Sequence, residues 1–149
     1  MRAEHQLPGM PITDDAGLKR ALDAETVAVV GCSTTPGKAA HDVPAYLQRQ
    51  GYRVIPVNPF AETVLGEPAY DDLEAVGQAV DLVNVFRPSD EVPTILAAVC
   101  DRHADRGDVE TAWLQLGIRH DEAAAEAEAD GIDVVQDRCM KVEHGRLIG

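Results

Sequence analysis

The segment GCSTTPGK, residues 31–38, combines a glycine, three hydroxyl side chains and a lysine. It follows the apolar run TVAVVG and precedes AAHDVPAYLQRQG, which predicts a helix. Gly31 permits a tight turn, the helix start offers free N–H groups to a phosphate, and Lys38 adds positive charge. These residues predict a phosphate site, with Cys32 and Ser33 in the turn itself. An ordinary strand-to-helix loop with capping residues is the alternative.

Two known phosphate motifs fit this segment imperfectly. The P-loop pattern GxxxxGK[ST] fails in its spacing, since five residues rather than four separate Gly31 from Gly37, and it fails again at Ala39, where a hydroxyl would hold magnesium. The dinucleotide pattern GxGxxG fails at Ser33, and the next predicted strand ends in IPVNPF without the acid that binds ribose. The sequence therefore favours a phosphorylated ligand other than NAD. An NAD(P)-dependent oxidoreductase with a degenerate fingerprint stays open as an alternative.

Two further strand ends carry polar or rigid residues. Pro56 and Pro59 fix the backbone on either side of Val57 and Asn58, and the Asn58 amide can both donate and accept, for example to an adenine edge or a ribose. Arg87, in FRPS, has a planar fork of donors that suits phosphate. The alternatives are a capped strand end at Asn58 and a surface ion pair at Arg87.

The segment DRCMKVEH contains the best candidate for covalent chemistry. Arg138 and Lys141 flank Cys139, and neighbouring cations favour the thiolate form. Glu143 and His144 could move protons. Cys139 is therefore a weak candidate for a catalytic residue. The simpler interpretation is that Cys139 packs as a small apolar residue and that His144 lies on the surface.

The elements that must position these residues alternate between strand and helix. We expect strands over residues 26–31, 52–59, 79–86, 109–117 and 132–137. Helices are expected over 13–25, 39–51, 87–107 and 119–131, with Thr13 and Ser89 as N-caps and Pro44 tolerated only in a first turn or at a kink. Residues 60–76 are expected to form a loop or short strand with a small helix, 1–12 a loose lead-in, and 138–149 a segment of uncertain form.

This alternation predicts an α/β fold with a doubly wound, five-stranded parallel sheet, Rossmann-like, of strand order 3-2-1-4-5 and with helices on both faces. Ligands of such sheets bind beyond the carboxyl ends of the strands. The 149 residues, 45% of them apolar, suit one domain over residues 1–149.

Composition excludes several functions. A net charge of -13 disfavours nucleic acid and anionic membranes as partners. Such acidity is typical of a salt-accumulating, halophilic host, although base composition alone could produce it. Three cysteines without paired spacing argue against a disulfide framework and a zinc site, so no metal is expected. Without a signal peptide or an apolar membrane segment, the protein is expected to be cytoplasmic.

Five segments in order and spacing resemble the small CoA-binding proteins: VAVVGCSTTPGK, GYRVIPVNPF, VNVFRPSDEVP, AWLQLGI and VVQDRCMKVEH. That family is similar to the CoA-binding Rossmann domain of the succinyl-CoA synthetase alpha chain and of ADP-forming acyl-CoA synthetases. The resemblance covers residues 15–147. It implies coenzyme A (CoA) as the cofactor, lying across the carboxyl ends of the strands.

The resemblance also implies roles for residues at those ends. The turn at 31–33 would meet the diphosphate, with Lys38 supplying charge, and residues 57–59 would contact the adenosine. The remaining implied contacts flank the nucleotide or wall the cleft: Arg87, Pro88, Trp113, Gln115 and Gly117.

The ligases carry further domains with a phosphorylated histidine, for which 149 residues leave no room. We therefore expect a non-catalytic CoA or acyl-CoA binding protein, acting as a carrier, a sensor or a partner of an acyl-CoA enzyme, with homodimerisation also open. An enzyme of CoA thiol or thioester chemistry that uses Cys139 is the alternative.

Overall fold

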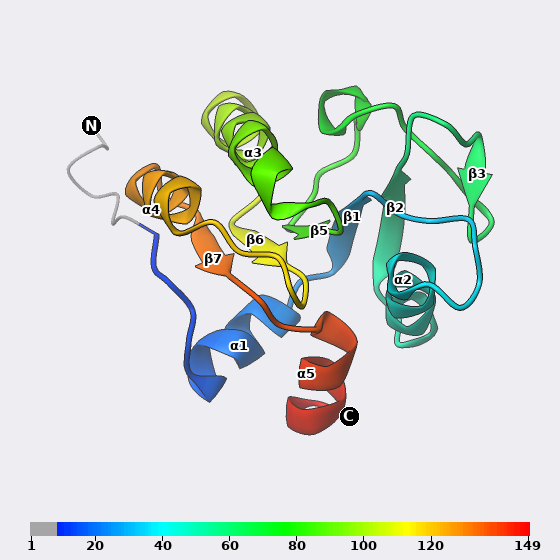
Figure 1. Ribbon diagram of the computed structural model, residues 1–149, viewed down its shortest axis with the longest axis horizontal. Coiled ribbons are helices and arrows are strands. Elements are labelled where there is room, and N and C mark those ends of the chain that lie inside the picture. The colour runs from blue at the N-terminus through cyan, green and yellow to red at the C-terminus, as the bar shows by residue number, and fades with distance from the viewer. Residues whose placement is uncertain (1–8) are drawn as a thin grey trace.

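The computed structural model describes residues 9–149 and contains a five-stranded parallel sheet (Figure 1). Its strands are β1 (Thr26–Val30), β2 (Arg53–Val57), β5 (Leu82–Val85), β6 (Thr111–Leu114) and β7 (Asp133–Val135). They lie in the order β2-β1-β5-β6-β7. The predicted α/β class is confirmed, and each strand lies within its predicted segment.

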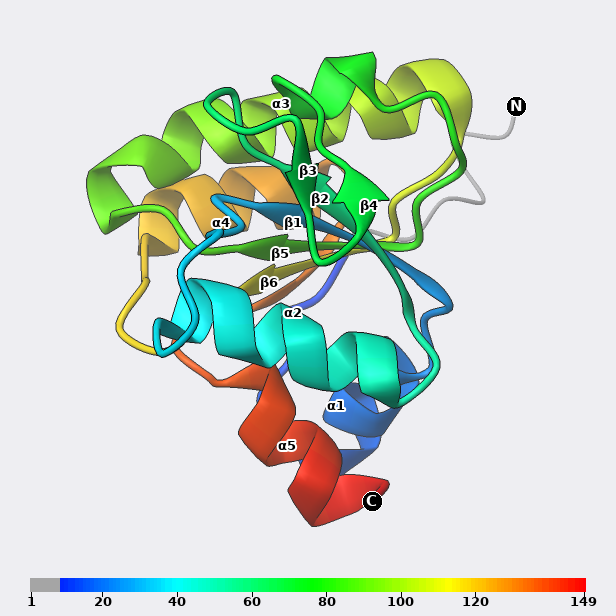
Figure 2. The same ribbon diagram turned by 90° about the vertical axis from the view of Figure 1, so that its right-hand side faces the viewer.

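Helices cover both faces of this sheet (Figures 1 and 2). One face carries α1 (Asp15–Leu22), α2 (Ala39–Arg49) and α5 (Met140–Leu147), and the other carries α3 (Val92–Arg106) and α4 (Asp121–Ala129). Between β2 and β5 lie a small hairpin, β3 (Thr63–Val64) with β4 (Glu67–Pro68), and the short 3-10 helix η2 (Leu73–Ala75). A second 3-10 turn, η3 (Ser89–Glu91), precedes α3. No helix in residues 9–149 is long and apolar enough to cross a membrane.

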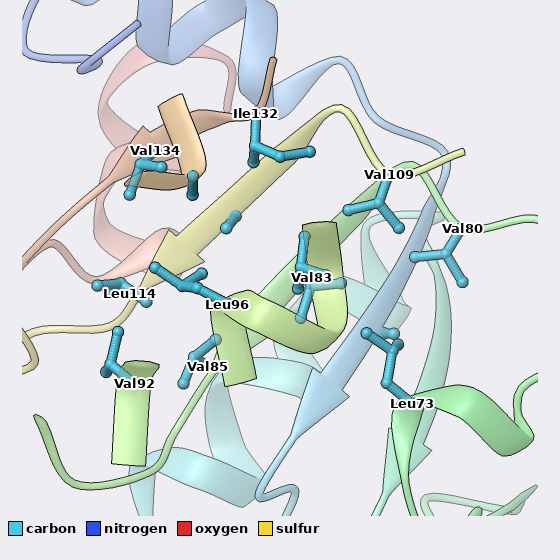
Figure 3. Packing of buried hydrophobic residues seen from close by; sticks show 14 of the residues in the cluster. Leu73, Val80, Val83, Val85, Val92, Leu96, Val109, Leu114, Ile132 and Val134 are labelled. Carbon is cyan, nitrogen blue, oxygen red and sulfur yellow. The ribbon is translucent and has the colours of Figure 1, made fainter. Parts of the chain in front are cut away.

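The core consists of two apolar layers, one on each side of the sheet. Val27 and Val29 of β1 pack toward α1, α2 and α5, whereas Ala28 packs toward α3 and α4. Figure 3 shows the second layer, in which Val83 and Val85 of β5 lie among side chains of the covering helices. Because both faces are buried, the strands appear in the sequence as continuous apolar runs rather than alternating ones.

The order of the strands differs from the expected one. Numbered along the chain, the five parallel strands run 2-1-3-4-5 rather than 3-2-1-4-5. The outer edge of β2 is occupied by the segment after β4: the Asn58 N–H donates to the Tyr70 carbonyl at 2.8 Å, and the Tyr70 N–H donates to the Pro56 carbonyl at 3.0 Å. The third long strand, β5, therefore pairs with the free side of β1.

This order decides where a ligand can bind. The β1–β2 connection passes through α2 on one face, and the β5–β6 connection passes through α3 on the other. The two connections diverge between β1 and β5, and a crevice opens at such a divergence. The site is therefore expected at the carboxyl ends of β1 and β5.

The starts of two helices differ from the expectation. Asp14, not Thr13, caps α1, with its Oδ1 accepting from the Gly17 N–H at 2.9 Å. Ser89 lies in η3 and does not cap α3; its hydroxyl instead accepts from the Arg119 N–H at 3.0 Å. The proline that follows Arg87 extends the backbone, so the chain makes a 3-10 turn before α3 begins.

The part of the lead-in that the structure describes is not loose. Met10 and Ile12 exchange backbone hydrogen bonds with Val134 of β7, at 3.1 and 2.9 Å. As the edge strand, β7 would otherwise leave these groups unpaired, and the pairing covers them. Residues 1–8 of the expected lead-in lie outside the described part of the chain.

Candidate functional site: a cavity at the carboxyl ends of β1, β2 and β5

A cavity of about 630 Å³ opens at the divergence between β1 and β5. This volume is within the range of small-molecule sites. The loops after β1, β2 and β5 form three of its sides, and α3 forms another. The residues that line it are Val30, Gly31, Cys32, Ser33, Lys38, Ala40, Val57, Asn58, Pro59, Phe60, Asp71, Asp72, Leu73, Phe86, Arg87, Glu91, Thr94, Ile95 and Ala98.

Gly31 brings the three strand ends together. Its N–H donates to the Val57 carbonyl of β2 at 3.0 Å, and its φ of +86° lies in the left-handed region. A Cβ at this position would lie 2.7 Å from the Phe86 carbonyl oxygen and 2.8 Å from the Arg87 Cδ. Only glycine therefore lets the turn after β1 approach the end of β5 this closely.

The turn after Gly31 is fastened to α2 by an unusual backbone bond. Pro44 lies inside α2, and because proline has no N–H, the Ala40 carbonyl lacks its partner within the helix. The Ser33 N–H donates to this carbonyl at 2.9 Å. Pro44, expected only in a first turn or at a kink, is thus accommodated further along the helix. By leaving the Ala40 carbonyl free, it makes available the acceptor that holds the turn.

The N-terminus of α2 faces the cavity without a side-chain cap. Lys38 is its N-cap residue and makes no capping bond, whereas Asp14 and His120 cap α1 and α4 with their side chains. Within residues 9–149, no hydrogen bond engages the N–H groups of Ala39 and Ala40. The Asp42 carboxylate, in the first turn, accepts from the Gly37 N–H at 3.1 Å. The free N–H groups, the helix dipole and the Lys38 ammonium favour an anion at this helix start.

Asn58 connects the end of β2 to this turn. Its Nδ2 donates to the Cys32 carbonyl at 2.9 Å, and its Oδ1 accepts from the Phe60 N–H at 2.7 Å. The sequence predicts that this amide contacts an adenine edge or a ribose. In the structure, the Asn58 side chain uses one donor and one acceptor in hydrogen bonds to the protein backbone, so Asn58 shapes the cavity wall.

Arg87 also lines the cavity, but its guanidinium is already paired. Its Nε and Nη2 donate to the two carboxylate oxygens of Glu91, at 3.0 and 2.7 Å. This pairing raises the pKa of Arg87 and lowers the pKa of Glu91. The ion pair expected as the alternative for Arg87 is therefore present, inside the cavity. Pro88 begins the 3-10 turn and is not among the lining residues.

Several lining residues were not expected from the sequence. Asp71 and Asp72 add carboxylates to the side of the cavity beside β2, and the Asp72 Oδ1 accepts from the Ala75 N–H at 2.9 Å. At the start of α3, four residues spaced three, one and three apart line the opposite wall: Glu91, which is the N-cap residue, and Thr94, Ile95 and Ala98 of the helix. That spacing places them on one helix face, and it is visible in the sequence.

The expected contacts from the end of β6 lie elsewhere. Trp113 is completely buried, and its Nε1–H donates to the Arg138 carbonyl at 2.8 Å. The buried Gln115 Oε1 accepts from the Met140 N–H at 3.2 Å, and the Gly117 N–H donates to Asp137 at 2.7 Å. These residues fix the loops after β6 and β7, and none lines the cavity.

The cysteine and histidine candidates are also separate from the cavity. Cys139 is the N-cap residue of α5 and is partly buried against the apolar layer between the sheet and α1, α2 and α5. His144 is buried rather than on the surface, its Nδ1 lies 2.8 Å from the Tyr46 hydroxyl, and burial lowers its pKa. Cys32 does line the cavity, but burial raises the pKa of its thiol to about 12.

Comparisons with family models, sequences and solved structures relate this chain to other proteins. A family model described as a CoA binding domain matches residues 25–145. The uncharacterized protein YneT of Bacillus subtilis is 34% identical over 130 residues, which are 87% of this chain and 93% of that protein. A solved hypothetical protein from Pyrococcus horikoshii superposes with a TM-score of 0.85 at 30% identity, covering 93% of this chain and 96% of that one.

A third relative is much longer. The ADP-forming acetate–CoA ligase II of Archaeoglobus fulgidus is 31% identical over 75 residues, which are 49% of this chain. The matched segment is only 11% of the ligase. The comparison therefore relates this chain to one portion of that protein.

Proposed function

Because the chain belongs to the CoA binding domain family, we propose that the cavity binds coenzyme A, either free or acylated. The diphosphate lies against the turn at residues 31–38 and the start of α2, and the adenosine lies toward residues 57–60. The observation that carries this proposal is the uncapped N-terminus of α2, with Lys38, opening into the cavity. A diphosphate is the kind of group that such a helix start binds.

Local charge supports this orientation. The whole chain has a net charge of -13, so its overall field repels an anionic ligand. Lys38 and Arg87 are the cationic side chains that line the cavity, and they come from the loops after β1 and β5. The carboxylates of Asp71 and Asp72 lie on the β2 side. The diphosphate is therefore stabilised near the α2 start, and the ribose 3′-phosphate of CoA must point away from residues 71–72.

We also propose that the chain binds CoA without reacting with it, as a carrier, a sensor or a partner of an acyl-CoA enzyme. The described lining residues include no histidine, and burial raises the pKa of the Cys32 thiol to about 12. Of the lining carboxylates, Glu91 is paired with Arg87, and Asp71 and Asp72 lie on the side proposed for the adenosine. A general base near a thiol or thioester would need to lie within hydrogen-bonding reach. Cys139 and His144 do not supply one, since neither lines the cavity.

Isothermal titration with CoA, acetyl-CoA, NAD and NADP tests the ligand. We expect both CoA forms to bind and the nicotinamide nucleotides to give no heat. Lys38→Ala should weaken CoA binding roughly 10- to 150-fold, the effect of losing a charged hydrogen bond. The matched control is Lys19→Ala, which removes an exposed lysine of α1 outside the cavity and should leave affinity unchanged. Heat with NAD but none with CoA would reject the proposal.

A native mass spectrum of the purified protein tests the proposed partners. A co-purified mass equal to CoA or an acyl-CoA would identify the bound form directly. A dimer mass would show self-association. Incubation with acetyl-CoA, followed by analysis of the ligand, tests the non-catalytic role: hydrolysis or transfer of the acetyl group above the uncatalysed rate would contradict it.

A further inference from the structure

Phe60 is an exposed aromatic residue on the rim of the cavity. Its relative exposure is 96%, the highest among the large apolar residues in the described part of the chain. An aromatic ring left in water loses the free energy that burial would provide. A single exposed apolar residue is ordinary on a protein surface. Phe60 differs because it is one of the residues that line the cavity.

The backbone around Phe60 is held in place. Pro59 restricts the preceding φ, and the Asn58 Oδ1 accepts the Phe60 N–H at 2.7 Å. The same Asn58 amide donates to the Cys32 carbonyl at 2.9 Å. The position of Phe60 is therefore fixed relative to the turn that we propose as the diphosphate site. A side chain presented on such a support can bind a ligand with little additional ordering.

The surroundings of Phe60 suit a nucleobase better than a phosphate or an aliphatic chain. Asp71 directly follows Tyr70, whose carbonyl accepts the Asn58 N–H at 2.8 Å, so residues 58–60 and 70–72 form the same side of the cavity. The carboxylates of Asp71 and Asp72 can accept hydrogen bonds from an exocyclic amino group. They also repel phosphate, which is drawn instead to Lys38.

We propose that Phe60 stacks on the adenine ring of the bound nucleotide and so favours ligands that carry a nucleobase. This inference rests on the proposed function and adds the residue that recognises the base. Stacking on an aromatic side chain accepts any base, because every base has a π-face, and its contribution is lost when the aromatic side chain is truncated. Phe60 thus reads the adenosine end of the ligand, while the α2 start holds the diphosphate.

The test compares CoA with 4′-phosphopantetheine, which lacks the adenosine with its 3′-phosphate and keeps one phosphate of the diphosphate. Phe60→Ala should weaken CoA roughly 5- to 150-fold, as expected for one base stack, and leave 4′-phosphopantetheine unchanged. Phe60→Tyr should retain the wild-type affinity for CoA. The matched control is Leu116→Ala, because Leu116 is 68% exposed and lies outside the cavity lining.

Phe60→Trp provides a direct optical signal. Trp113, the natural tryptophan, is completely buried, so a tryptophan at position 60 would report separately on the rim. We expect CoA to quench this fluorescence and 4′-phosphopantetheine to leave it unchanged. Circular dichroism is used to check that each variant is folded.

The outcomes separate this inference from the proposed function. Absence of CoA binding by the wild-type chain rejects the proposed function and, with it, this inference. Wild-type binding that Phe60→Ala leaves unchanged rejects the stacking role alone. An equal loss for CoA and 4′-phosphopantetheine also rejects it, since Phe60 would then contact the pantetheine arm. Self-association that depends on Phe60, with CoA affinity unchanged, would assign the residue to a protein interface instead.

Discussion

The amide of Asn58 donates to the carbonyl of Cys32 at 2.9 Å, and this bond joins the end of β2 to the turn after β1. Both residues line the cavity. The bond lies between two loops that are far apart in sequence, and it sets the distance between the proposed adenosine and diphosphate sites. A change of a single atom in the Asn58 side chain should therefore affect both stability and ligand binding.

Asn58→Asp replaces the donating amide nitrogen with a carboxylate oxygen facing the Cys32 carbonyl. We expect a loss of about 1–3 kcal/mol in the free energy of unfolding, because two acceptors then oppose each other. CoA affinity should fall further than in Asn58→Ala, which removes the bond without adding a negative charge. Urea unfolding and isothermal titration measure the two effects. Equal CoA affinity in the two variants would show that the added charge is remote from the ligand.

Gly31→Ala tests the close approach of β1 to β5. A Cβ at this position would lie 2.7 Å from a backbone oxygen, and its φ of +86° is unfavourable for alanine. We expect a loss of about 3 kcal/mol in stability and a cavity that no longer binds CoA. Gly37→Ala is the matched control. Gly37 has a φ of +97° but nothing within 4 Å of an added Cβ, so only the backbone term of about 1 kcal/mol remains. Equal losses in the two variants would refute the steric argument.

In the proposed complex, Glu91 competes with the ligand for Arg87. Glu91→Gln removes the carboxylate that occupies the Nε and Nη2 donors and leaves a side chain of the same shape. We expect this variant to bind CoA several-fold more tightly, because a phosphate can then use the whole guanidinium fork of Arg87. Arg87→Ala should bind CoA more weakly, because it removes that fork. Asp105→Asn, which neutralises an exposed carboxylate of α3 outside the cavity lining, should leave affinity unchanged. Weaker binding in Glu91→Gln would mean that Glu91 positions Arg87 for the ligand.

His144 should make stability sensitive to mild acid. Burial lowers its pKa in the folded protein from an ordinary value of 6.5, so the unfolded chain binds this proton more readily. The stabilising contribution is complete above pH 6.5 and is lost as the pH falls from there toward the lower folded pKa. Tyr46 and Tyr52 face the imidazole, and Lys141 lies over the Tyr46 ring.

We expect the free energy of unfolding to fall between pH 7 and pH 5, and to fall less in His144→Gln. The measurement is urea unfolding followed by Trp113 fluorescence across this pH range. His120→Asn is the control, since asparagine can retain the cap of α4 while one histidine is removed. An identical pH dependence in the wild type and His144→Gln would show that His144 does not control this loss.

Much of the site follows from reading the ends of the predicted strands. The β-branched runs identify β1, β2 and β5, and the residues just after them include Gly31, Asn58 and Arg87, all of which line the cavity. This worked because the carboxyl ends of parallel strands meet at one edge whatever their order. The same reasoning also named Trp113 and Gln115, which lie outside the cavity lining because both side chains are buried and bonded within the protein.

The kind of fold, the turn at Gly31 and the positive charge of Lys38 could be predicted from the residues alone, since these depend on local chemistry and on the periodicity of apolar residues. Tertiary structure alone decided the strand order, through the pairing of Tyr70 with the edge of β2. It also decided the pairing of Arg87 with Glu91, the exposure of Phe60 on the rim and the burial of His144. Each of these depends on which distant segments come into contact, and local propensity carries no information about such contacts.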